Sequence, residues 1–279
     1  MNFRAALVQM RSGRDMARNL ADAAAMIREA KAGGAAYVQT PEVTNIFEPD
    51  KERLKAIAKA EADDETVRSF SELAKELGLW LHAGSFALRA DATRLANRSL
   101  LFAPDGRVAA RYDKIHLFDI DLPSGESHRE SATYAPGAEA VSISLPIAIL
   151  GLTICYDIRF PPLFNALAKA GAGVITVPSA FTVPTGEAHW HVLLRARAIE
   201  TGSFVLAAAQ GGVHDSGRAT FGHSLAVNPW GEIIAEGLTE PQVIYADIDP
   251  AQSAQARARV PALVHVRNFD LKPASFMVS

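Results

Sequence analysis

Residues 150–162 read L-G-L-T-I-C-Y-D-I-R-F-P-P and contain Cys155, the only cysteine among 279 residues. The apolar run 147–154 is short enough for a buried strand, and polar residues followed by two prolines end it abruptly. Cys155 is therefore expected where a strand stops, at the edge whose side chains face a crevice in open α/β sheets. The prolines also predict a helix start, and the N–H groups of a helix N-terminus favour a nearby thiolate.

The composition of the chain excludes several classes of protein. Hydrophobic residues make up 49% of the sequence, which is enough for a large core, and the formal net charge is −3. Without a basic excess, a nucleic-acid partner is not expected. The apolar runs are all strand-sized and the N-terminus lacks the pattern of a signal peptide, so no membrane segment is expected. A single cysteine excludes an internal disulfide and favours a cytoplasmic location, where a free thiol stays reduced.

Predicted strands and helices alternate along the chain without a composition break or a Gly/Ser linker. This alternation predicts one α/β domain spanning 1–279 with layered sheets, in which 261–279 form a tail that reaches toward a partner subunit. The loop 119–136 is longer than a connector needs, which is typical of a functional loop. Strands are expected at 3–9, 36–39, 80–87, 140–144, 147–154, 174–177, 204–209 and 243–248, hairpins at 97–112 and 224–235, and helices at 14–32, 51–60, 65–77, 162–170, 187–201 and 250–260.

Two further residues suited to chemistry follow predicted strands. Glu42 comes after the strand 36–39, and Lys114 comes after the second strand of the hairpin 97–112. A thiol that attacks a carbonyl needs a base, a donor for the developing oxyanion and an acid for the leaving nitrogen. Glu42 could serve as base and then acid, and Lys114 could stabilise the oxyanion and lower the pKa of the thiol. These residue types predict a cysteine hydrolase built on Cys155.

Two alternative functions compete with the cysteine hydrolase. Ser224 lies in G-H-S-L-A, which is close to the G-x-S-x-G nucleophile elbow, but it begins a predicted strand instead of a strand-to-helix turn. A non-catalytic binding module, with Cys155 in its core, Glu42 as a loop carboxylate and Lys114 as a solvated cation, also fits the individual residues.

The histidines give no signal for a metal site. His189 and His191 are two residues apart on a predicted helix, so they point in different directions. The other histidines show no ligand spacing and are expected to be hydrogen-bonded or exposed; they are His82, His116, His128, His214, His223 and His265.

Three separate segments resemble the signature segments of the nitrilase or carbon–nitrogen hydrolase superfamily, in the order of that superfamily. They are T-P-E-V-T-N at 40–45, Y-D-K-I-H-L-F-D at 112–119 and G-L-T-I-C-Y-D-I-R-F-P at 151–161. The resemblance implies a four-layer α-β-β-α sandwich that assembles into homodimers or larger homo-oligomers. It also implies a triad of Glu42, Lys114 and Cys155, with Glu130 of H-R-E-S as a further site glutamate. A triad of this kind requires no metal and no organic cofactor.

Within the superfamily, the segments 178–200, 208–212 and 221–232 look most like the amidases that act on deaminated glutathione. The ω-amidases, which act on 2-oxoglutaramate and 2-oxosuccinamate, share much of this pattern. Hydrolases of other small amides, N-carbamoyl compounds or nitriles use the same triad, as do acyltransferases with an amine acceptor. Pro162 and Thr201 depart from residues that are common in the family, and these departures bear on the shape of the pocket.

The resemblance implies a mechanism in which Cys155 attacks an amide carbonyl and forms a thioester. The backbone N–H of Tyr156 and the ammonium of Lys114 would hold the oxyanion. Arg159 is the expected contact for an anionic acyl group, and other candidates for the pocket are Arg195, Arg197, and His214 and Thr220 near a predicted Gly211-Gly212 turn.

Overall fold

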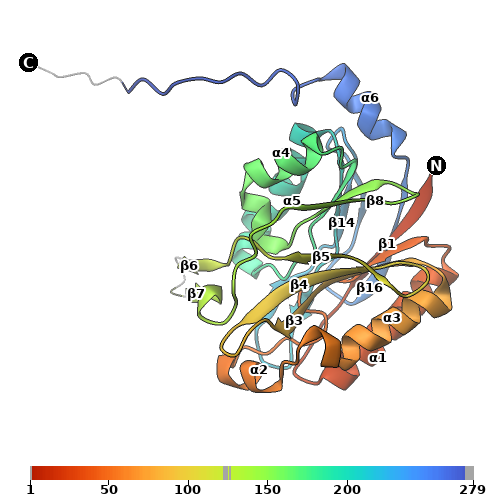
Figure 1. The fold of residues 1–279 in the computed structure, drawn as a ribbon, viewed down its shortest axis with the longest axis vertical. Coiled ribbons are helices and arrows are strands. Elements are labelled where there is room, and N and C mark those ends of the chain that lie inside the picture. Colours follow the sequence, from red (N-terminus) through yellow and green to blue (C-terminus); the bar gives the residue numbers. More distant parts are fainter. Residues whose placement is uncertain (1, 122–124, 126, 274–279) are drawn as a thin grey trace, which may run out of the picture.

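The computed structural model describes residues 2–121, 125 and 127–273, and within them the chain forms an α/β fold of four layers (Figure 1). Two six-stranded sheets pack face to face, and helices cover their outer faces. The first sheet has the order β16-β1-β2-β3-β4-β5, and its strands are β1 (Phe3–Gln9), β2 (Tyr37–Gln39), β3 (Trp80–Arg89), β4 (Leu95–Phe102), β5 (Val108–Asp113) and β16 (Gln242–Ile248).

The second sheet has the order β15-β14-β11-β10-β9-β8. Its three central strands β9, β10 and β11 run parallel, as β1, β2 and β3 do in the first sheet. The strands of this sheet are β8 (Val141–Ser144), β9 (Ile149–Leu152), β10 (Val174–Thr176), β11 (Phe204–Ala207), β14 (Leu225–Val227) and β15 (Ile233–Glu236).

The helices are α1 (Met16–Ala32), α2 (Lys51–Ile57), α3 (Glu65–Leu77), α4 (Pro161–Lys169), α5 (Val183–Thr201) and α6 (Ala251–Arg259). Two short sheets complete the fold, one of β6 (Asp119–Asp121) and β7 (Ser127–Arg129) and one of β12 (Gly211–Val213) and β13 (Ala219–Phe221). Short 3₁₀ turns lie at Glu61–Asp63, Glu130–Ala132 and Cys155–Arg159.

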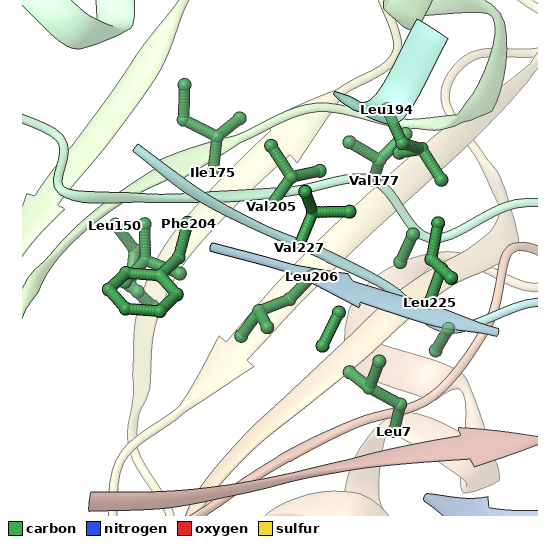
Figure 2. Close-up of a cluster of buried hydrophobic side chains, with 14 of the residues drawn as sticks. Leu7, Leu150, Ile175, Val177, Leu194, Phe204, Val205, Leu206, Leu225 and Val227 are labelled. Atoms are coloured by element: carbon green, nitrogen blue, oxygen red, sulfur yellow. The ribbon is translucent and has the colours of Figure 1, made fainter. Parts of the chain in front are cut away.

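The alternation of side chains along β1 explains the layers. Leu7 belongs to the core between the two sheets, where Figure 2 shows it pointing toward the side chains of the second sheet. Val8 points the other way and packs in the cluster that contains Ile27 of α1 and Phe70 of α3. Because successive residues of a strand face opposite sides, one apolar strand serves both interfaces.

Most element positions match the sequence predictions, and the exceptions have local causes. The strand 147–154 was expected to reach the cysteine, but β9 ends at Leu152 and a 3₁₀ turn begins at Cys155. Helix α5 begins at Val183 instead of 187, because Pro184 fits the first turn of a helix. The predicted Gly211-Gly212 turn lies in strand β12, and the expected loop 119–136 includes β6 and β7; its residues 122–124 and 126 lie outside the described residues.

Beyond α6, residues 261–273 extend away from the sheets, and Phe269 and Leu271 are 88% and 85% exposed (Figure 1). The remainder of the predicted tail lies outside the described residues. Among the helices of the described residues, none combines the length and apolar character needed to cross a membrane.

Candidate active site

Cys155 occupies a strained position at the start of its 3₁₀ turn. Its φ is +48°, in the left-handed region that non-glycine residues rarely adopt. Its backbone N–H donates to the carbonyl of Pro178 at 2.9 Å, and the residue is only 6% exposed. The strand therefore gives way to a sharp turn that presents the thiol to the interior of a cavity.

The carboxylate of Asp157 holds this turn against the segment that carries Lys114. One oxygen accepts hydrogen bonds from Ile154 N (2.8 Å) and from the Tyr112 hydroxyl (2.7 Å). The other lies 3.1 Å from His116 N and 2.7 Å from His116 Nδ1. Asp157 is fully buried, so its four partners replace the water that a free carboxylate would bind.

Lys114 is buried between two carboxylates. Its Nζ lies 2.8 Å from Oε1 of Glu42, and 2.9 and 3.1 Å from the two oxygens of Glu130. Burial alone would lower the pKa of the lysine, but the negative charges of Glu130 and Glu42 outweigh burial and hold that pKa well above its ordinary value. Lys114 therefore stays an ammonium inside the cavity.

Glu42 follows β2 and meets the thiol directly. Its Oε2 accepts a hydrogen bond from Ala180 N at 2.9 Å, and its side chain hydrogen-bonds the Cys155 thiol. Burial raises the pKa of Cys155 well above its ordinary value, the charge of Glu42 raises it further, and Lys114 opposes them without prevailing. The sequence led us to expect a thiol activated by Lys114, whereas the geometry indicates a resting thiol that must pass its proton to Glu42.

Asn97 of β4 is a site residue that the sequence analysis missed. Its Nδ2 donates to Oε1 of Glu42 at 2.9 Å and to Oε1 of Glu130 at 3.0 Å, and its carbonyl accepts from Lys114 N at 3.0 Å. A buried asparagine in an otherwise apolar strand was the only available signal, and polar residues in strands are too common to identify a site.

Gly84 of β3 allows the segment that carries Glu42 to lie close to the sheet. A Cβ atom at this position would lie 2.0 Å from the carbonyl oxygen of Thr40, and the Gly84 N–H donates to Thr40 Oγ1 at 3.2 Å. Val43, directly after the glutamate, has a φ of +50°. The tight path of this segment is what directs Glu42 toward Lys114.

A cavity of about 370 Å³ contains the four predicted catalytic residues. Glu42, Lys114, Glu130 and Cys155 all line it, and Tyr156 lines it beside the thiol. Other lining residues are Phe47, Lys51, Asn97, Phe118, His128, Arg129, Tyr134, Phe181, Thr185 and Arg218. The site therefore combines a nucleophile, an acid–base group and a cation with a partly aromatic wall.

The other predicted contacts lie outside the lining. The guanidinium of Arg159 lies 5.8 Å from the ring centroids of Tyr156 and of Phe181, and its Nη2 lies 3.2 Å from His189 Nδ1. Arg195 donates to the carbonyl of Gly231 (2.8 Å), and Arg197 to that of Ile158 (2.8 Å). None of these arginines is among the cavity-lining residues.

His214 lies behind the wall of the cavity. Its ring stacks on Phe47 with a centroid separation of 4.0 Å, and its nitrogens lie 2.7 Å from Ser12 O and 2.8 Å from Thr220 Oγ1. His214 and Thr220 therefore support the lining instead of belonging to it.

The two departures from the family pattern also lie away from the lining. Pro162 is an exposed residue of α4, and Thr201 is buried with its hydroxyl donating to the carbonyl of Arg197 at 2.6 Å. Neither residue lines the cavity.

Ser224, the alternative nucleophile, is fully buried and outside the lining. Its Oγ accepts a hydrogen bond from Ala209 N at 2.9 Å, directly before strand β14. No strand-to-helix elbow follows it, so the structure disfavours the serine hydrolase.

One histidine–carboxylate cluster outside the cavity lining has ligand atoms close enough for a metal ion. The ligand atoms of His191, His223 and Glu236 all lie within 4.8 Å of one another. Glu236 Oε1 lies 2.7 Å from His191 Nε2 and 3.0 Å from His223 Nδ1, so hydrogen bonds account for the cluster. Sequence spacing gave no sign of it because its members come from α5, from the residues before β14 and from β15.

Residues 4–258 match the family described as carbon-nitrogen hydrolase. The chain is 39% identical over 269 residues to a deaminated glutathione amidase of Yersinia enterocolitica, covering 95% of this chain and 93% of the relative. It is 36% identical over 267 residues to an omega-amidase of Homo sapiens, covering 96% of each.

A solved structure of an amidase from Nesterenkonia sp. AN1 carries the acetamide moiety of fluoroacetamide on its active-site cysteine. It is 26% identical to this chain, with a TM-score of 0.79 and coverage of 95% of this chain and 97% of that chain. On the family match and the extent of these similarities, the chain belongs to the carbon–nitrogen hydrolase family and is a hydrolase of C–N bonds other than peptide bonds.

Proposed function

We propose that this enzyme hydrolyses the amide bond of deaminated glutathione through a thioester on Cys155. The observation that carries the proposal is the meeting of a thiol, a carboxylate and a buried ammonium in one cavity, with Glu42 bonded to both other groups. The deaminated glutathione amidase of Yersinia enterocolitica, similar over nearly the whole chain, supports the choice of substrate.

In the first step, the Cys155 thiol passes its proton to Glu42 as sulfur attacks the amide carbonyl. The tetrahedral intermediate carries a negative charge on oxygen, and the Lys114 ammonium and the N–H of Tyr156 stabilise it. The charge of Lys114 is permanent because two carboxylates hold its pKa high. Proton transfer within the thiol–carboxylate hydrogen bond creates the thiolate only when substrate is present.

In the second step, the intermediate collapses and the C–N bond breaks. Glu42 returns the proton to the departing nitrogen, so cysteinylglycine leaves as a neutral amine and a 2-oxoglutaryl thioester remains on Cys155. Glu42 then takes a proton from water, which attacks the thioester and releases 2-oxoglutarate. The same carboxylate regenerates the thiol, and no redox change occurs.

Glu130 and Asn97 have positioning roles in this scheme. Glu130 holds Lys114 through two oxygens and accepts a hydrogen bond from Phe118 N at 2.6 Å. Asn97 donates to both glutamates and so fixes their separation. Residues that lock the geometry of reacting groups in this way reduce the reorganisation that catalysis requires.

The second candidate substrate is 2-oxoglutaramate, because the human relative is an omega-amidase. The same residues would release ammonia instead of cysteinylglycine. Other small amides, N-carbamoyl compounds and nitriles follow the same chemistry at Cys155.

The proposal is tested by intact-protein mass and product release with deaminated glutathione and, separately, 2-oxoglutaramate. We expect rapid release of cysteinylglycine, slow turnover of the simple amide and a transient 2-oxoglutaryl adduct. Cys155→Ala and Cys155→Ser should form neither product nor adduct while keeping the fold, because a hydroxyl ionises far less readily than a thiol. Faster release of ammonia than of cysteinylglycine would favour the omega-amidase, and normal activity of either variant would exclude the mechanism.

The proposal includes a cytoplasmic homo-oligomer. Helix α5 exposes Val192 (68%) and Ile199 (55%), and the segment after α6 exposes Phe269 and Leu271. Burial of such side chains in a subunit interface would remove apolar surface from water. Light scattering on the purified chain measures the molar mass, and truncation after residue 260 should shift it toward the monomer.

A further inference from the structure

The cavity wall contains an arginine that the proposed mechanism does not use. Arg218 lies in the turn between β12 and β13 and lines the same cavity as Cys155. Its guanidinium carbon lies 5.2 Å from the centroid of the Phe47 ring, which also lines the cavity. A cation over an aromatic face keeps its N–H edge available for another partner.

The hydrogen-bonding capacity of Arg218 is largely unused. Its Nε is buried and has no hydrogen-bond partner within the described part of the chain. Its Nη2 lies 3.5 Å from His128 Nδ1, which is long for a hydrogen bond, and no carboxylate of the described residues pairs with it. An unsatisfied buried donor is costly unless a partner binds there.

The other cations of the lining are engaged differently. Lys114 is held by Glu42 and Glu130, and Arg129 pairs with Asp121 at 2.8 Å. Lys51 is exposed and donates to a backbone carbonyl at 3.2 Å. Arg218 is thus the partly buried cation of the lining that has no carboxylate partner among the described residues.

We propose that Arg218 binds a carboxylate of the substrate and makes the enzyme selective for anionic over neutral amides. This inference rests on the proposed amidase function. A guanidinium offers two parallel N–H donors that match the geometry of a carboxylate, and Phe47 restricts the plane in which they lie. Arg159, which the sequence suggested for this role, contacts Tyr156 and Phe181 instead and does not line the cavity.

Two carboxylates of deaminated glutathione have the required chemistry. One belongs to the 2-oxo acid on the acyl side of the scissile bond, and the other ends the leaving dipeptide. 2-Oxoglutaramate carries only the first, so comparison of the two substrates identifies the source.

The test compares Arg218→Met, Arg218→Lys and the matched rim variant Lys51→Met on deaminated glutathione, 2-oxoglutaramate and neutral butyramide. For Arg218→Met we expect KM for the bound anion to rise about 10- to 100-fold, with kcat and butyramide hydrolysis nearly unchanged. Loss with both anions assigns the acyl-side carboxylate, and loss with deaminated glutathione alone assigns the dipeptide carboxylate. Arg218→Lys should restore part of the affinity, and Lys51→Met should have a smaller effect.

Binding to a catalytically inert protein separates this inference from the proposed function. Calorimetric titration of both anions into Cys155→Ala, with and without Arg218→Met, should show weaker binding of at least one anion in the double variant. Arg218-dependent binding without turnover by the wild-type chain would reject the proposed substrates and uphold the carboxylate contact. Equal binding by both proteins, no binding by either, or equal loss with butyramide would overturn the assignment of Arg218.

Discussion

The hydroxyl of Tyr112 donates a 2.7 Å hydrogen bond to the carboxylate of Asp157, two residues beyond Cys155 and across the interface between the two sheets. Tyr112 lies at the end of β5, two residues before Lys114. The bond therefore connects the segment of the cation to the turn of the nucleophile. Burial first, and the charge of Asp157 second, raise the pKa of Tyr112 well above its ordinary value, so the hydroxyl stays a donor.

Tyr112→Phe should remove this connection while keeping the ring in the core. We expect the free energy of unfolding to fall by about 2 kcal/mol, since a buried carboxylate loses a donor, and kcat to fall because the turn at Cys155 is less restrained. Urea unfolding and steady-state kinetics measure both quantities. Unchanged kcat alongside lower stability would limit the bond to a structural role.

Lys114→Met should reduce kcat on the order of a hundredfold or more, because the oxyanion loses its buried cation. It also leaves Glu42 and Glu130 facing each other without the charge between them, so we expect lower thermal stability. Kinetics over a range of substrate concentrations measure the loss. A rise in KM alone would show that Lys114 binds substrate without stabilising the transition state.

Asn97→Leu should test whether the amide fixes the two glutamates. We expect kcat to fall between about 10- and 100-fold, as when reacting groups are misplaced, with a smaller change in KM. The comparison variant is Asn97→Asp, which keeps the shape but replaces the donor with another negative charge beside Glu42 and Glu130. Full activity in Asn97→Asp would contradict the donor role.

Gly84→Ala should displace the segment that carries Glu42, since the new Cβ would lie 2.0 Å from Thr40 O. We expect a loss of about 1–3 kcal/mol in stability and a lower kcat. Gly173→Ala is the matched control, because its nearest neighbours would lie at an ordinary 3.6 Å. Thermal unfolding and kinetics of the two variants should differ clearly, and equal behaviour would refute the argument from close approach.

His82 should make stability depend on pH. Burial lowers the pKa of this histidine from 6.5 to about 3, so between these pH values the unfolded chain binds a proton that the folded chain does not. The contribution of His82 to stability is therefore full above pH 6.5 and is lost as pH falls toward 3. At pH 5 the loss should be about 2 kcal/mol.

Urea unfolding at pH 7 and pH 5 measures this effect, and His82→Gln should flatten the difference between the two pH values. The glutamine can keep hydrogen bonds to Tyr37 and Ser99, the partners of His82 at 2.8 and 2.6 Å. The same pH dependence in both proteins would assign it to other groups.

Local sequence patterns predicted most of the elements that bring the site together. Glu42 and Lys114 follow apolar runs that become strands β2 and β5, and the edges of a sheet where strands end are determined by local pattern. Cys155 was placed at the end of its strand to within three residues, since the turn geometry at positive φ leaves no mark on hydrophobic periodicity. The order of the three motifs along the chain also predicted the four layers.

By itself, the sequence determined the alternation of strands and helices, the family to which the chain belongs and the residues with the chemistry of an amidase. Only the tertiary structure decided that Asn97 joins two glutamates, that Asp157 joins two motifs, and that Arg218 rather than Arg159 lines the cavity. The physical reason is that hydrophobic period and turn chemistry act over neighbouring residues, whereas these contacts depend on strand register and on packing between segments distant in the chain.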